Sequence, residues 1–73
     1  MHELLTQQIH EEIVLLQRAE AQANQLLQTA RAEHVSFGLE YNYVDEDIAR
    51  IIGRLHYMQL VAERLEAACQ EDG

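Results

Sequence analysis

The chain has 73 residues, no proline, one cysteine and a formal net charge of −8 at pH 7. This length allows one small domain, the single cysteine excludes an internal disulfide, and so acidic a chain is not expected to bind DNA or RNA directly. The dominant residue types, Ala, Leu, Gln, Glu and Arg, lose little on entering a helix, so the composition predicts an all-α fold.

The first predicted helix runs from about residue 3 to residue 35. Its apolar residues occupy an arc of about 160° on the helical wheel, wider than contact with one other helix requires, which predicts more than one neighbour. Glu20 and His34 also fall in this arc, and either each reaches water or they form a buried polar pair that fixes the register. The apolar residues of the arc are Leu5, Ile9, Ile13, Leu15, Leu16, Ala19, Ala23, Leu26, Leu27 and Ala30.

A connecting segment is predicted at residues 36–44, where apolar and aromatic residues alternate with small or polar ones. It holds three of the four aromatic residues, namely Phe37, Tyr41 and Tyr43. Two interpretations stay open: the aromatic side chains fold back and cover the end of the helix pair, or the segment is a recognition loop or short extended edge that binds another chain.

The second predicted helix runs from about residue 45 to residue 70 and begins with an acidic turn that complements its dipole. Its apolar residues recur in alternating steps of four and three, the spacing of a seam along which two helices pack. The predicted seam consists of Val44, Ile48, Ile51, Leu55, Met58, Ala62, Leu65 and Cys69.

These two apolar patterns match when the chain folds back on itself, because large residues then meet small ones. The predicted register brings together residues whose numbers sum to about 78 or 79, such as Leu16 with Ala62 and Ala23 with Leu55. We therefore predict an antiparallel two-helix hairpin. Since one hairpin leaves part of the wide arc uncovered, we also predict a symmetric homodimer that forms a four-helix bundle.

The most informative surface feature is a ridge on the outside of the second helix, with Leu60 beside it. Arginine and tyrosine are over-represented at binding hot spots. Three interpretations remain: the ridge packs against the first helix of a second subunit, binds a different protein, or holds a small anionic ligand such as a nucleotide between two subunits. The ridge consists of Arg50, Arg54, Tyr57, Val61 and Arg64.

Catalysis and metal binding are not expected, and no cofactor is implied. Although the predicted register brings His10 near Cys69, no spacing places two strong metal ligands on one helical face. A nucleophile, a base and a preorganised pocket are not apparent. Mimicry of nucleic acid is a lesser alternative, because the carboxylates form clusters rather than rows.

The residues at the N-terminus do not have the pattern of a signal peptide, and no apolar run approaches the length of a membrane span. We therefore expect a soluble, cytoplasmic protein without membrane contact. The leading functional prediction is a small non-enzymatic interaction protein, of inhibitor or adaptor type, that binds a larger partner protein and blocks or chaperones it.

Overall fold

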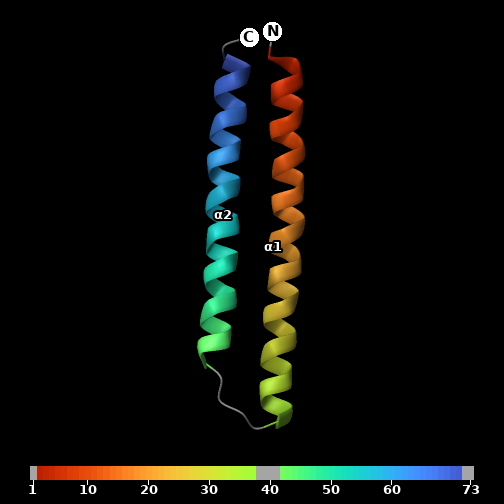
Figure 1. The fold of residues 1–73 in the computed structure, drawn as a ribbon, viewed down its shortest axis with the longest axis vertical. Coiled ribbons are helices and arrows are strands. Elements are labelled where there is room, and N and C mark those ends of the chain that lie inside the picture. Colours follow the sequence, from red (N-terminus) through yellow and green to blue (C-terminus); the bar gives the residue numbers. More distant parts are fainter. Residues whose placement is uncertain (1, 38–41, 72–73) are drawn as a thin grey trace.

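In the computed structural model the chain forms two helices that lie side by side, α1 (Glu3–Phe37) and α2 (Asn42–Glu71) (Figure 1). The structure describes the backbone of residues 2–37 and 42–71, and the side chains of residues 2–33 and 45–71. The helices contact each other extensively and run in opposite directions, so the predicted all-α antiparallel hairpin is confirmed.

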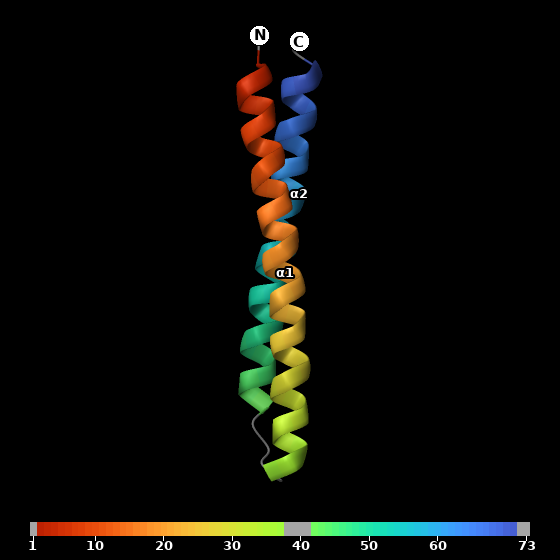
Figure 2. The same ribbon diagram turned by 90° about the vertical axis from the view of Figure 1, so that its right-hand side faces the viewer.

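The hairpin is long and narrow. It extends 57 Å along its axis and only 15 and 10 Å across. A quarter turn places α1 in front of α2, with both ends of the chain at the same end of the molecule (Figure 2). Each helix therefore has one helical neighbour, and much of its circumference stays uncovered.

The helix boundaries differ from the prediction near the connection. Helix α1 ends at Phe37, two residues later than expected, and α2 begins at Asn42, three residues earlier. The alternating aromatic pattern had suggested a longer connection, but a sequence pattern locates helix ends only to within a few residues. The side chains of Phe37, Tyr41 and Tyr43 lie outside the described residues, as does that of His34.

The core between the helices is thin. Among the described side chains, the buried apolar ones are Ile9, Ile13 and Ile48, each 5–7% exposed, and no large side chain is completely covered. The largest contribution to stability in a small helical domain comes from burial of apolar surface. A core of three buried side chains therefore supplies little of this stabilisation.

The contact face of α2 is rotated relative to the predicted seam. Ile48, Leu55, Ala62 and Cys69 lie at least partly covered, as predicted. The seam positions between them do not, because Ile51, Met58 and Leu65 are each 51–53% exposed. Their places are taken by the residues that follow them in sequence, Ile52, Gln59 and Glu66, and by Asp45. The predicted phase of α2 was therefore wrong by roughly 50°, half of the angle between consecutive residues of a helix.

On α1 the covered positions also follow alternating steps of three and four. They are Thr6, Ile9, Ile13, Leu16, Glu20, Ala23, Leu27 and Ala30, with Val14 and Ala19 at the margins. Leu5, Leu15 and Leu26, which belong to the predicted arc, remain 47–54% exposed. The arc is thus wider than the area that α2 covers.

The ion pairs between the helices do not follow the predicted register, although the predicted pair of Leu16 and Ala62 lines one groove. Three ion pairs join α1 to α2 among the described side chains, and the two residue numbers add up to 76 in each pair rather than to 78 or 79. The pairs are His10 with Glu66, Glu20 with His56, and Arg31 with Asp45.

Candidate functional site

One long side of the hairpin carries the three ion pairs, and we refer to their six residues as the ion-paired side. The nitrogen-to-oxygen distances are 3.1 Å for His10 and Glu66, 3.3 Å for His56 and Glu20, and 3.5 Å for Arg31 and Asp45. In each pair the acidic side chain is largely covered, while the basic side chain is mostly exposed. The hairpin thus provides partners within the chain for the charges on this side.

Glu20 combines features of both interpretations of its sequence position. Its side chain is about one quarter exposed and lies against His56, rather than being wholly solvated. The Oε1 atom itself is buried and lies 3.3 Å from His56 Nδ1 without the geometry of a hydrogen bond, so the two groups form an ion pair when the imidazole is protonated. The partner is His56 of α2, and sequence reasoning did not identify this pair.

Gln59 is a buried polar residue that sequence reasoning did not single out. The residue is 7% exposed, and its Nε2 atom has no hydrogen-bond partner among the described residues. A buried amide without a partner reduces stability. Hydropathy gives no signal for this position, because Met58 beside it is the more obvious candidate for the seam.

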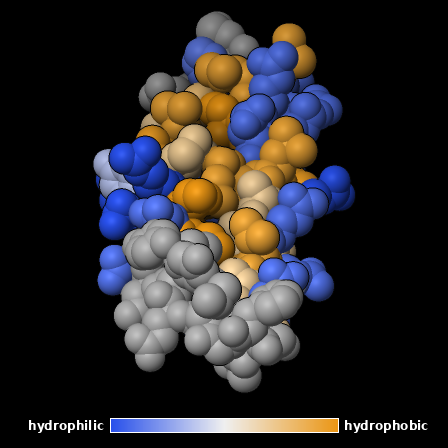
Figure 3. Space-filling model, turned by 60° about the horizontal axis from the view of Figure 1, so that its bottom comes forward, coloured by the Kyte–Doolittle hydropathy of each residue, from blue (hydrophilic) through white to orange (hydrophobic). Residues whose placement is uncertain are grey.

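The opposite side of the hairpin is apolar, and five large side chains form what we call the apolar face. They come from both helices and are each about half exposed: Leu5, Leu26, Ile51, Met58 and Leu65. Figure 3 shows apolar side chains gathered along the middle of one face, with hydrophilic side chains on both margins.

An apolar groove between the helices places these residues on one side of the molecule. The groove has a volume of about 390 Å³. Glu12 borders it, and Leu5 and Leu26 lie seven and fourteen residues from Glu12, so they share its side of α1. The groove is lined by Ile9, Glu12 and Leu16 of α1 and by Tyr57, Met58, Val61, Ala62 and Leu65 of α2.

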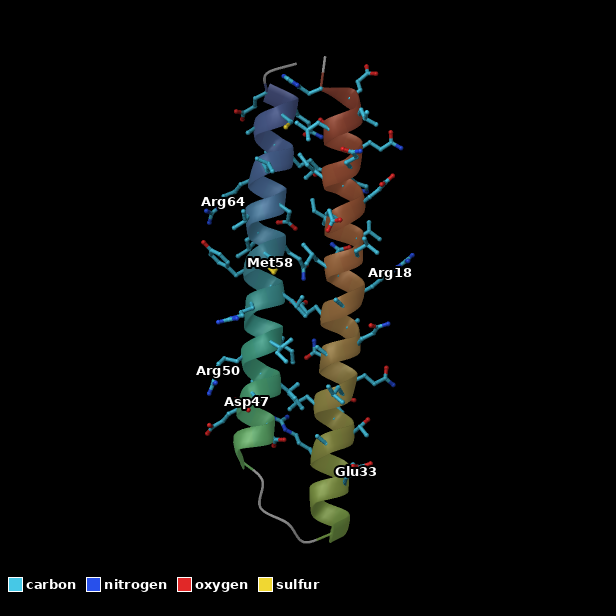
Figure 4. The ribbon with its side chains drawn as sticks, in the orientation of Figure 1. Arg18, Glu33, Asp47, Arg50, Met58 and Arg64 are labelled. Carbon is cyan, nitrogen blue, oxygen red and sulfur yellow. The ribbon has the colours of Figure 1, made fainter. Side chains whose placement is uncertain are left out.

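The ridge predicted from the sequence lies on the outer side of α2, and all of its residues are exposed. Arg50 and Arg64 point away from α1, as Figure 4 shows. Arg50 forms an ion pair with Asp47 of the same helix, at 3.1 Å. Within the described part of the chain, no ion pair is formed by Arg54 or Arg64.

Two shallow depressions adjoin the ridge, and Arg50 and Arg54 line both of them. One has a volume of about 450 Å³ and also includes Gly53, Tyr57 and Met58. The other, of about 270 Å³, also includes Asp47 and Ile51. Exposed guanidinium groups beside a tyrosine ring match the chemistry of acidic or aromatic groups on a binding partner.

His10 and Cys69, which the sequence had brought into proximity, line one open depression of about 610 Å³ near the free ends of the helices. The ring of His10 contacts Glu66 rather than the thiol. Over residues 2–37 and 42–71 no group of three or more His, Cys, Asp or Glu residues is arranged to hold a metal ion.

Comparisons of this chain with protein-family models, with curated proteins and with solved structures find no match. Neither helix, over the described ranges, has an apolar stretch long enough to cross a membrane. The fold and its surfaces therefore define the class of molecule: an antiparallel helical hairpin with an ion-paired side, an apolar face and an arginine-rich ridge.

Proposed function

We propose that this chain is a non-enzymatic protein interaction module that binds a larger partner protein through the ridge on α2, and that it blocks or chaperones this partner. The observation that carries the proposal is the exposure of Arg54, Tyr57 and Arg64 on one outer face, with neither arginine ion-paired in the described part of the chain. Residues of these types dominate the binding energy of many protein interfaces.

The charge distribution supports a specific role for this face. The chain is strongly acidic and contains no lysine, yet three of its five arginine residues lie on the ridge. Arginine forms bidentate hydrogen bonds with carboxylates, and its planar group stacks on aromatic rings. The chemistry of the ridge therefore suits a partner surface that carries carboxylates next to aromatic side chains.

We propose further that the module is a cytoplasmic homodimer. The described core contains three buried apolar residues, whereas chains of this size usually need an additional source of stability. A single cysteine excludes an internal disulfide, and it is compatible with a reducing compartment. Association of two hairpins supplies additional burial of apolar surface.

A second candidate function is the binding of a small anionic ligand such as a nucleotide. The observation that favours it is that Arg50 and Arg54 line two neighbouring depressions. Both depressions are shallow and open, and the ion pair between Arg50 and Asp47 already neutralises part of the positive charge there. A thermal-shift panel of nucleotides tests this alternative, because a ligand that binds the folded state raises the melting temperature.

The proposed function is tested by replacing Arg54, Tyr57 and Arg64 together with alanine. We expect helicity and oligomeric state to be unchanged and partner capture to be lost, because truncation of one hot-spot residue can already cost about 2 kcal/mol. Partners are captured from the native host with the tagged chain and identified by mass spectrometry, and light scattering measures the oligomeric state.

The matched control replaces three exposed residues on the outer side of α1, Glu11, Arg18 and Gln25, with alanine. Arg18 points away from α2 (Figure 4). This variant should retain every partner that the wild-type chain captures. A ridge variant that also retains every partner contradicts the proposal, and one that dissociates the dimer assigns the ridge to assembly instead.

A further inference from the structure

We infer that the apolar face is the interface of a symmetric dimer in which two hairpins pack face to face and antiparallel, with the twofold axis passing between them at the level of Met58. The inference rests on the homodimer proposed above, to which it adds a surface and a symmetry. It does not depend on the role of the ridge.

The exposed area of the apolar face approaches that of an interface. Its five side chains are each about half exposed, which leaves on the order of 500 Å² of apolar surface, within the range of the largest patches found on monomers. A stable interface buries about 800 Å² on each partner. Leu16 and Ala62, which line the groove and are only partly covered, extend the surface toward that size.

The distribution of charged residues favours this side of the hairpin, rather than the other sides, as the interface. Glu12 is the one charged residue in the lining of the apolar groove, over the part of the chain that the structure describes. The opposite side carries ion pairs, and the outer side of α2 carries the arginines. Burying charged groups in an interface is costly, so the apolar face is the one that a second hairpin covers most favourably.

The pattern on α2 suits a second copy of the chain as the occupant. A twofold interface is self-complementary, because residue i contacts residue j and residue j contacts residue i. Ile51, Met58 and Leu65 are spaced seven residues apart, with Met58 in the middle. A twofold axis at Met58 therefore places Ile51 opposite Leu65 of the second copy, and Met58 opposite its own equivalent.

The positions on α1 are compatible with the same axis. Leu16 and Met58 line the same groove, and Leu5 and Leu26 lie on opposite sides of this level along α1. The apolar side chains of both helices are therefore distributed on both sides of an axis at Met58. This arrangement also separates the acidic first turns of the two α2 helices, which would lie together if the hairpins were parallel.

Disulfide formation at Met58 tests the arrangement. In a Cys69→Ser background, Met58→Cys should form a covalent dimer on mild oxidation, about ten-fold faster or more than Ile51→Cys, because two Cβ atoms must approach to about 4 Å. Ile51→Cys should cross-link efficiently only when Leu65→Cys is added. Leu60→Cys, which is exposed outside the apolar face, is the matched control and should stay unlinked.

The possible outcomes test the symmetry of the dimer separately from its existence. Cross-linking at Met58 but not at Leu60, together with a dimer of the reduced Met58→Cys variant in sedimentation equilibrium, is the expected outcome. A dimer that cross-links at Met58 no faster than at Leu60 overturns the antiparallel arrangement. A folded monomer overturns the inference as a whole and the proposed homodimer with it, but leaves partner binding by the ridge unaffected.

Discussion

The two long sides of this hairpin differ in where their side chains find partners. On the ion-paired side, Glu66, Glu20 and Asp45 contact basic residues of the other helix. On the apolar face, Ile51, Met58 and Leu65 leave about half of their surface to solvent. Among the described side chains, the hairpin therefore provides partners for the charges of one side and leaves the apolar residues of the other side about half exposed, which motivates the proposed dimer.

The largest effect is expected for a charge placed in the contact between the helices. Leu55→Asp should prevent folding, because a charge at a partly covered seam position costs several kcal/mol, on the order of the whole stability of a small domain. Leu60→Asp should leave the helices intact, since Leu60 is exposed. Circular dichroism melts compare the two variants. Equal loss of helix in both would show that the contact face of α2 lies elsewhere.

A smaller change, an increase in the free energy of unfolding, is expected when Gln59 is replaced. Replacing it with methionine, which has a similar shape, removes a buried amide whose nitrogen has no partner among the described residues, and should raise the free energy of unfolding by about 1 kcal/mol. Urea unfolding at one fixed protein concentration measures the change. The exposed Gln17→Met is the control. Destabilisation at Gln59 would mean that the amide has a partner, which a second subunit could supply.

A gain of similar or smaller size is expected from Gly53→Ala. A Cβ atom at this position meets nothing within 4 Å, so the substitution removes the helix penalty of glycine, about 0.5–1 kcal/mol, without a clash. Thermal melts report the stability, and sedimentation reports the oligomeric state. Gly53 lies outside the apolar face, and dissociation of a dimer by this substitution would show that another backbone approaches α2 closely there.

The smallest effect is expected on the ion-paired side. Replacing His10 and His56 together with glutamine should lower the free energy of unfolding by less than about 1 kcal/mol, because both imidazole rings are mostly exposed and exposed ion pairs are weak. Urea unfolding at pH 7 measures the loss. A decrease of about 2 kcal/mol or more would mean that these pairs, and not the apolar contacts, determine the register of the hairpin.

The helical hairpin could be predicted because the sequence pattern that indicates each helix lies within that helix. Composition and the steps of three and four along each segment identify two helices and a turn between them. The exposure of the ridge could be predicted for the same reason, since Arg54, Tyr57 and Arg64 fall outside any apolar seam.

The rotation of α2 could not be predicted in this way. Ile51 and Ile52 are both apolar, so hydropathy does not show which of them faces α1. In the structure Ile52 faces α1, in a register where Asp45 and Glu66 contact Arg31 and His10. Such pairings involve residues far apart in sequence, and a pattern read along a single helix does not contain them.

The central claim is that the apolar face requires a second hairpin, and sedimentation equilibrium at micromolar concentration tests it most directly. We expect the wild-type chain to have twice the 8.4 kDa mass of one chain. Leu65→Glu should shift the population toward monomer, because it places a charge within the covered surface, opposite Ile51 of the second copy. A wild-type chain that is fully helical and strictly 8.4 kDa under these conditions would contradict the account.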